Sequence, residues 1–138
     1  MKNLSLEKSG KVKFWIKNGV LLCEISDINC RLTEEKIKTY IREIEILTKG
    51  KPMPFLIDIR NFVGNFSISA AKLFAKSPVL KKTRISEAFV ADTLNGKLLI
   101  NSYKRIYDPE TFFQVFNTVE DAFEFCIESK NKFHARQN

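Results

Sequence analysis

The chain has 138 residues, 44% of them hydrophobic and 28% charged, a balance that excludes an intrinsically disordered protein and suits an apolar core. Lysine and arginine number 23 against 16 acidic residues, and the formal charge of +7 favours an anionic partner such as an acidic protein, a phospholipid surface or a nucleic acid. No apolar run approaches the roughly 20 residues that cross a bilayer, and the first residues lack the apolar segment of a secretory signal, so we expect a cytoplasmic protein without a transmembrane segment.

The first predicted element is a β-hairpin. The segment VKFWIKNGVLLCEI places Asn18-Gly19 between two strand-like runs, and this pair favours the positive φ angles of a type I′ turn. A helix is expected over about residues 33–49. Thr33 can cap its first amides and Gly50 can end it.

The rest of the chain alternates short apolar runs with amphipathic segments. Apolar runs bounded by proline or polar residues are typical of buried strands, whereas apolar residues at helical spacing predict helices. The expected elements are a strand at 55–59, a helix from 67 or 69 that stops before Pro78, a strand at 88–92, a helix at 96–107, a strand from 111 and a helix from 118.

The predicted order is therefore β-β-α-β-α-β-α-β-α. Strands joined through helices tend to run parallel, with right-handed connections. We expect an α/β fold, a five-stranded, mostly parallel mixed sheet with an antiparallel edge and about four helices packed on it. One domain would cover residues 1–138, with its core at about 12–130 and short polar termini.

Several local phrases carry a family resemblance. These are NGVLLCEI, LTEEKIKTYI, PFLIDIR, AFVADTLNGKLLINSY and TFFQVFNTVEDAFEF. Over about residues 12–130 the chain resembles the SpoIIAA-like superfamily, which includes STAS domains and the related lipid-binding CRAL-TRIO fold. The last phrase is similar to bacterial STAS-like proteins of unknown function. The phrases specify an architecture, and a fold does not by itself define a function.

The resemblance implies a regulatory site after the central strand. In anti-sigma-factor antagonists of the STAS class, this strand ends in an aspartate, and a kinase phosphorylates a hydroxyl at the start of the next helix. Asp58 resembles that aspartate, and Ser67 and Ser69 fall roughly at the phosphoacceptor position, within the segment NFSISAA. The simpler role of these serines is to cap the helix.

The carboxyl ends of the strands form the candidate binding site, because ligands of open α/β sheets bind at this edge. Asp58 can instead orient the following turn by accepting its amides. The two phenylalanines of the loop either cover the core or form an exposed apolar patch for a partner or a lipid. The candidate partner- or ligand-binding residues are Asp58, Arg60, Phe62, Phe66, Asp92 and Asn95.

The densest group of basic residues follows this loop. It is either a solvated face or a surface for an acidic partner. Its members are Lys72, Lys76, Lys81, Lys82 and Arg84. The sequence has no RNA-binding aromatic signature and no zinc-finger spacing, which argues against a nucleic-acid partner.

Recognisable catalytic motifs are missing from the sequence. The only histidine, His134, lies in the polar C-terminal tail, so a buried Ser-His-Asp or Cys-His arrangement has no base. Cys23, Cys30 and Cys126 lack the spacing of zinc ligands or of a disulfide framework, and we expect Cys23 and Cys126 to pack in the core. No phosphate-binding glycine loop occurs. We therefore expect no enzyme, cofactor or metal.

Three hypotheses remain open at this point. The first is a regulatory module that binds another protein through the loop and helix at 58–76, and a homodimer is compatible with it. The second is a carrier of a lipid or small apolar ligand, of the CRAL-TRIO type. The third is an uncharacterised enzyme. An unfilled apolar pocket would favour the second, and a solid core with Phe62 or Phe66 exposed would favour the first.

Overall fold

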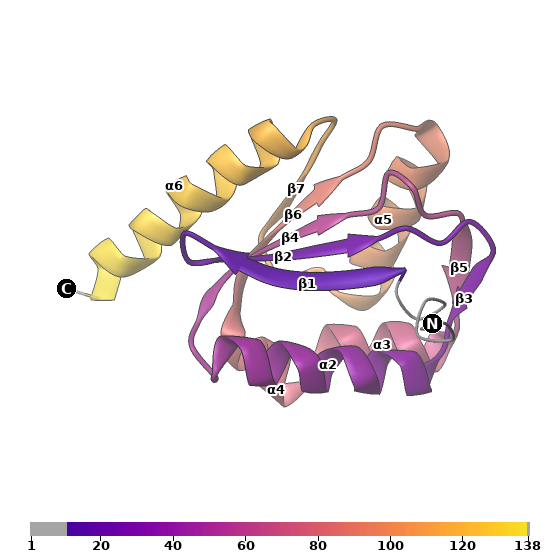
Figure 1. The fold of residues 1–138 in the computed structure, drawn as a ribbon, viewed down its shortest axis with the longest axis horizontal. Helices are drawn as coiled ribbons and strands as arrows, with labels where there is room; N and C mark the ends of the chain where they lie inside the picture. Colours follow the sequence, from indigo (N-terminus) through magenta and orange to yellow (C-terminus); the bar gives the residue numbers. More distant parts are fainter. Residues whose placement is uncertain (1–10, 138) are drawn as a thin grey trace, which may run out of the picture.

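The computed structural model describes residues 11–137 as a main sheet, a small sheet and five helices (Figure 1). The main sheet has the strand order β1-β2-β4-β6-β7, and a second sheet pairs β3 with β5. The strands are β1 (Val12–Lys17), β2 (Val20–Ile25), β3 (Cys30–Leu32), β4 (Met53–Asp58), β5 (Gly64–Phe66), β6 (Arg84–Val90) and β7 (Phe113–Phe116). The helices are α2 (Glu34–Thr48), α3 (Ile68–Lys76), α4 (Pro78–Thr83), α5 (Leu94–Tyr107) and α6 (Val119–Gln137).

Only one neighbouring pair of the main sheet is antiparallel. β1 and β2 form the hairpin, and the pairs β2–β4, β4–β6 and β6–β7 are parallel. The predicted five-stranded, mostly parallel sheet with an antiparallel edge is confirmed. The hairpin turn has Asn18 at φ 51° and Gly19 at φ 76°, the left-handed pair that a type I′ turn requires.

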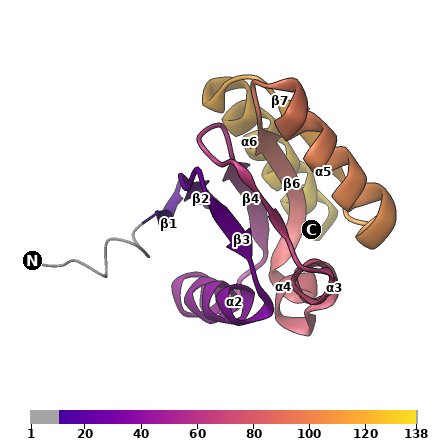
Figure 2. The same cartoon turned by 90° about the vertical axis from the view of Figure 1, so that its right-hand side faces the viewer.

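The central strand, β4, is buried along its whole length because helices cover both faces of the sheet. On one face, α6 packs Ala122 and Cys126 onto β2, β4 and β6 and is the only one of the described helices there. On the other face, α2, α4 and α5 pack onto the sheet with Ile44, Leu80 and Ile100. Figure 2 shows these layers edge-on. None of the described helices is long and apolar enough to cross a membrane.

The two cysteines expected in the core are both buried, which confirms that prediction. Burial raises the pKa of the Cys126 thiol to about 12. The pKa of Cys23 rises still further, chiefly through burial and then through the charge of Asp58. Both thiols therefore remain protonated at neutral pH and pack as small apolar groups.

The small sheet was not predicted. β3 runs parallel to β5, with Leu32 opposite Phe66 and Cys30 opposite Gly64. A Cβ atom on Gly64 would lie 1.9 Å from the carbonyl oxygen of Cys30, so only glycine permits the approach of these two strands. The contact ties the loop after β4 to the loop after β2.

Several boundaries differ from the sequence prediction by one or two residues, and two regions differ more strongly. Pro78 ends α3 as expected, but it also occupies the first turn of α4, where Ser77 caps the amide of Leu80 at 3.3 Å. β6 begins at Arg84 rather than at 88, because the charged side chains of Arg84 and Glu87 are paired inside the protein and do not end the strand.

Candidate functional site

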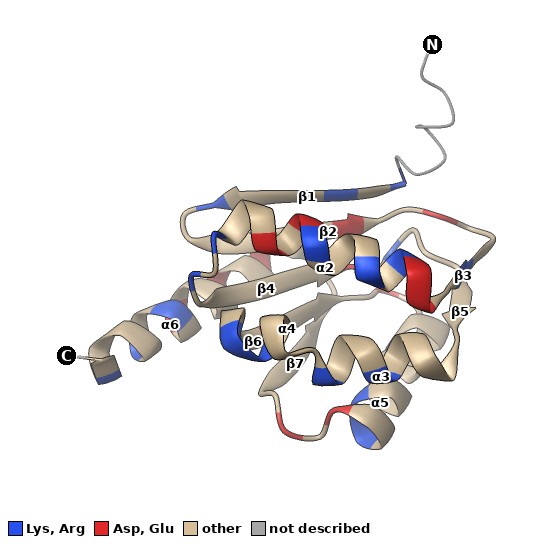
Figure 3. Ribbon diagram, turned by 90° about the horizontal axis from the view of Figure 1, so that it is seen from below, with Lys and Arg blue, Asp and Glu red and all other residues tan. Residues whose placement is uncertain are grey.

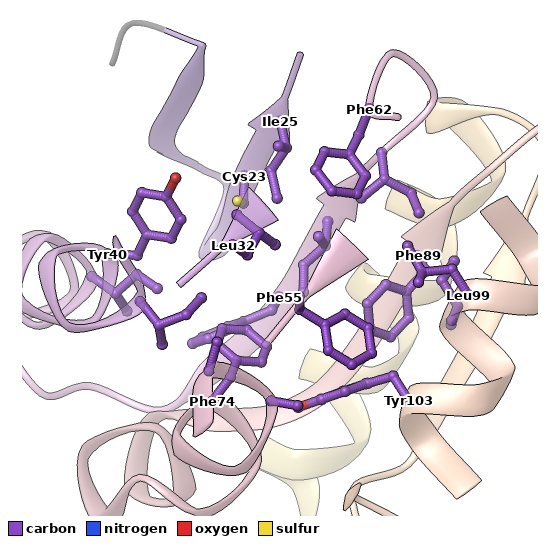
Figure 4. A pocket seen from close by; sticks show the side chains of 18 of the residues that line it. Cys23, Ile25, Leu32, Tyr40, Phe55, Phe62, Phe74, Phe89, Leu99 and Tyr103 are labelled. Carbon is purple, nitrogen blue, oxygen red and sulfur yellow. The ribbon is translucent and has the colours of Figure 1, made fainter. Parts of the chain in front are cut away.

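An apolar cavity lies beneath the sheet, between its strands and the helices α2, α3 and α5 (Figure 4). Its volume is about 120 Å³. Side chains of β2, β4 and β6 form the roof, and no nitrogen or oxygen atom of the described residues contributes to its surface. The residues of β2, β4 and β6 that line it are Leu21, Cys23, Ile25, Phe55, Ile57 and Phe89.

The segment 58–76, singled out in the sequence, forms another wall of this cavity. Phe62 is only 8% exposed and belongs to the core, and Phe66 is half-buried. The ring centroid of Phe66 lies 5.9 Å from that of Tyr103 and 6.1 Å from that of Tyr107, both in edge contacts. Phe62 and Phe66 therefore cover the core and do not form an exposed apolar patch, which was the open alternative.

Two tyrosines of the cavity wall carry hydroxyl groups. The hydroxyl of Tyr40 points away from the centre of the cavity (Figure 4), and burial raises its pKa to about 12. The hydroxyl of Tyr103 is buried without a partner among the described residues. Burial, followed by the charge of Glu87, raises the pKa of Tyr103 far above its ordinary value. Both tyrosines are neutral at physiological pH, so the wall carries no charge.

Asp58 and Arg60 form a paired turn at the end of β4. Asp58 Oδ1 accepts the backbone amide of Arg60 at 3.1 Å and its Nε at 3.0 Å, and Oδ2 accepts from Nη2 at 2.8 Å. These bonds with Asp58 raise the pKa of Arg60. The geometry is that of a carboxylate that orients its loop, the simpler of the two roles considered for Asp58.

The remaining polar candidates lie at the same edge of the sheet. Asp92 is exposed, and its charge contributes to the raised pKa of Arg60. Asn95 is exposed in the first turn of α5. Ser67 caps α3 by accepting the amide of Ala70 at 3.0 Å, and the hydroxyls of Ser67 and Ser69 lie 3.2 Å apart. The structure thus joins Asp58 and Arg60 by hydrogen bonds, whereas Asn95 is exposed at the same edge and is not part of this pair.

The predicted basic group is wrong in one member. Lys72 and Lys76 on α3 and Lys81 and Lys82 on α4 are exposed (Figure 3), but Arg84 is buried at the start of β6. Its guanidinium stacks over the ring of Phe74 at 5.0 Å and pairs with Glu87 and Asp108. The charge of Arg84 therefore pairs with buried carboxylates and does not contribute to the basic surface.

Arg84 belongs to a buried four-charge cluster, which consists of Arg84, Glu87, Lys104 and Asp108. Lys104 Nζ donates to Glu87 and, at 2.9 Å, to Asp108. Burial raises the pKa of Glu87 against the opposing effect of Arg84 and Lys104. Burial is the largest single effect on Asp108 and would raise its pKa, but the bonds from Lys104 and Thr111 and the charges of Lys104 and Arg84 together outweigh it and lower that pKa. The cluster contains two basic and two acidic groups, so with all four ionised its net charge is zero.

Sequence reasoning missed both the cavity wall and the four-charge cluster. The cluster had a weak signal, because Lys104 and Asp108 are four residues apart at the end of a predicted helix. Among the described residues, no group of histidine, cysteine, aspartate and glutamate has the arrangement of a metal site. The arrangement suits an uncharged apolar group, because the titratable residues that line the cavity, Cys23, Tyr40 and Tyr103, are neutral at physiological pH.

A model of a protein family, "Domain of unknown function (DUF7793)", matches residues 14–130. No curated protein matches the chain. Among solved structures, an uncharacterized protein of the DUF3478 family with a SpoIIAA-like fold, from Shewanella loihica PV-4, is 19% identical, with a TM-score of 0.56 over 83% of this chain and 91% of that one. An anti-sigma factor antagonist from Mycobacterium paratuberculosis is 14% identical, with a TM-score of 0.56 over 84% of this chain and 92% of that one.

At these identities the two structures establish the fold and nothing finer. They confirm the SpoIIAA-like fold that the resemblance in the local phrases implied. The family model extends from the middle of β1 into α6 and so includes the central strand, the segment 58–76 and most of the cavity wall. The chain therefore belongs to the DUF7793 family.

Proposed function

We propose that this protein binds a small, uncharged, apolar molecule in the cavity beneath its sheet. The observation that carries the proposal is an apolar cavity of about 120 Å³ in the middle of the fold. Protein interiors are normally close-packed. At roughly 24 cal/mol per Å³, a fully enclosed cavity of this size would cost at most about 3 kcal/mol of stability, and a pocket that is partly open to solvent costs less. A ligand that fills the space recovers the lost contacts.

The wall limits the chemistry of this ligand. A charged or strongly polar group would lose its hydration and find no partner in the wall, a cost of several kcal/mol. In size, the cavity approaches engineered apolar cavities of about 150 Å³, which bind benzene or xenon. The ligand class is therefore a single aromatic ring or a short aliphatic chain, and a longer lipid would require α3 to move.

Toluene should bind to the protein and raise its melting temperature. A ligand that binds only the folded state stabilises it by about 2.7 kcal/mol when its concentration is a hundred times its Kd. Isothermal titration calorimetry would measure the affinity and stoichiometry, and a thermal melt followed by circular dichroism would measure the stabilisation. Benzoate, which carries a charge on a similar ring, should not bind.

The variant Ala71→Leu separates this cavity from other apolar surfaces. Ala71 lines the cavity from α3, so a leucine at this position would occupy its space and abolish toluene binding. Ala135→Leu adds the same atoms at an exposed position of α6 and should leave binding unchanged. Equal toluene binding by the Ala71→Leu and parent proteins would show that the ligand lies elsewhere, and no binding by the parent protein would refute the proposal.

A second candidate function is a regulatory interaction through the segment 58–76. The supporting observation is that Val63 and Ile68, both in this segment, are 63% and 64% exposed beside the buried phenylalanines. The SpoIIAA-like fold, shared with an anti-sigma factor antagonist, is consistent with a protein partner. Ser67 and Ser69 remain candidate phosphoacceptors here, because a helix start favours a negative group.

Ile68→Asp should abolish capture of a protein partner without unfolding the domain, because Ile68 is exposed at the start of α3. The measurement is quantitative cross-linking mass spectrometry in extract of the source cells, with unfolding by urea as the stability check. Ile106→Asp is the matched control, since Ile106 is 60% exposed on α5. If both variants retain the same cross-linked proteins, the segment 58–76 is not the docking surface.

A further inference from the structure

A second hollow lies at the opposite end of the sheet from the segment 58–76. It has a volume of about 650 Å³, is open to solvent and lies between α4 and the C-terminal half of α6. Its base is formed where β6 and β7 begin, with Ile85, Phe112 and Gln114. We refer to it as the α4–α6 hollow. It shares no lining residue with the apolar cavity, so conclusions about it do not depend on the proposed function.

Aromatic side chains form the apolar part of the α4–α6 hollow. Phe112 is 62% exposed, although its ring packs against that of Phe125 with centroids 5.5 Å apart. Phe133, two turns along α6 from Phe125, is half-buried in the same wall. An exposed phenylalanine at the base of a concave surface is an anchor point for an apolar side chain of a partner.

Basic side chains surround these rings. Lys81 and Lys82 extend from α4, and Lys132 and Arg136 extend from α6. Glu128 is the one exposed acidic residue in the lining. Within residues 11–137, none of the four cations forms an ion pair. Figure 3 shows basic residues on both α4 and α6, with no acidic residue on α4. The net charge of the hollow's surface is therefore strongly positive.

We propose that the α4–α6 hollow binds an acidic segment of a partner protein that inserts an apolar side chain beside Phe112. Charge complementarity defines the acidic character of the segment, because four unpaired cations surround the hollow. The exposed ring of Phe112 defines the apolar anchor. A nucleic acid fits less well, because the rings of Phe112 and Phe125 pack on each other, which leaves fewer open ring faces for base stacking. A membrane surface is nearly flat and would not fill a concave hollow.

The test uses a short synthetic peptide in which glutamate alternates with phenylalanine and leucine, labelled with fluorescein. Fluorescence anisotropy would measure its affinity for the whole protein at low and high salt. We expect saturable binding that weakens as salt increases, because exposed charges are screened. Replacing every glutamate of the peptide by glutamine, or every apolar residue by serine, should each weaken binding at least tenfold.

The variants locate the binding on the molecule. Lys81→Glu combined with Lys132→Glu reverses one charge on each wall and should weaken binding at least tenfold. Lys72→Glu combined with Lys76→Glu makes the same change of charge on α3, where both lysines are exposed, and should change binding less than twofold. In a two-dimensional ¹H–¹⁵N spectrum, the amides of residues 81–85, 112–114 and 125–133 should shift. Phe112→Ser removes the aromatic ring proposed as the anchor and should also weaken peptide binding. If this variant does not fold, the pair Lys81→Glu and Lys132→Glu still tests the proposal.

Several results would overturn the proposal. The hollow is not a site for acidic peptides if the peptide does not bind, or if both charge-reversal pairs weaken it equally. Tighter binding of oligothymidylate would assign the hollow to nucleic acid, and tighter binding of vesicles rich in phosphatidylglycerol would assign it to a membrane. Amide shifts confined to residues 58–76 would place the contact at the other end of the sheet.

Discussion

Lys104→Met should lower the free energy of unfolding by about 3–5 kcal/mol, the range for breaking one partner out of a buried ion pair. Lys104 donates to the buried carboxylates of Glu87 and Asp108. Methionine keeps most of the side-chain volume, so the loss would measure the charge and its hydrogen bonds rather than a cavity. Urea unfolding followed by circular dichroism would measure it at neutral pH.

The cost of Lys104→Met should depend on pH. Without the lysine, the cluster keeps Arg84 and two carboxylates, and the pKa of Glu87 in the folded state rises further above its ordinary value of 4.5. The folded protein then holds a proton that the unfolded chain releases as the pH rises above 4.5, so stability falls as the pH increases through that window. The substitution should cost less near pH 4.5 than at neutral pH.

Two further variants show whether the loss of charge balance causes the lower stability of Lys104→Met. Arg105→Met changes an exposed cation on the same helix and should alter stability by no more than about 0.5 kcal/mol. Adding Glu87→Gln to Lys104→Met leaves one cation, Arg84, and one anion, Asp108, in the cluster. The double variant should therefore recover part of the lost free energy of unfolding. If Lys104→Met costs no more than Arg105→Met, the cluster does not stabilise the fold in the way described.

Phe55→Ala should also cost about 3–5 kcal/mol, the usual range for removing a buried phenylalanine ring. Phe55 is 1% exposed in the central strand, and its ring forms part of the roof of the apolar cavity. The enlarged cavity should accept naphthalene, which exceeds the parent cavity in size. Urea unfolding measures the first effect, and isothermal titration calorimetry with naphthalene measures the second.

The control for this variant is Phe112→Ala, which removes an exposed ring from the far end of the sheet. It should cost much less than Phe55→Ala and should give no naphthalene binding. A cost below about 1 kcal/mol for Phe55→Ala would mean that neighbouring side chains collapse into the space. In that case the cavity is not held open by the surrounding structure, and the proposed ligand site loses its basis.

Most of the fold could be predicted because local signals agree with it. Asn18-Gly19 specifies its own turn, and Thr33 with Gly50 brackets a helix, so neighbouring residues carry the information. The small sheet could not be predicted, because it pairs Cys30 with Gly64 across distant parts of the chain. Its strands have three residues each, too few to show an alternating pattern.

The candidate site was harder to predict than the fold. The segment 58–76 was identified correctly as a feature of the carboxyl edge, but whether Phe62 faces inward depends on side chains from several elements. A cavity cannot be predicted from a sequence, because its volume is a small difference between two large volumes. One is the volume that the folded backbone encloses, and the other is the volume that the side chains fill. Arg84 was misplaced for a related reason, since its partner Asp108 lies more than twenty residues away.

The pairing of β3 with β5 has a kinetic consequence for any molecule that occupies the cavity. Leu32 and Phe66, which lie opposite each other in this small sheet, both line the cavity. A ligand that leaves between these two strands must first break the backbone hydrogen bonds that join them. Local opening of this kind is much slower than side-chain rotation. The residence time of a ligand on that route would therefore depend on how often two three-residue strands separate, as well as on the contacts that the apolar wall makes with it.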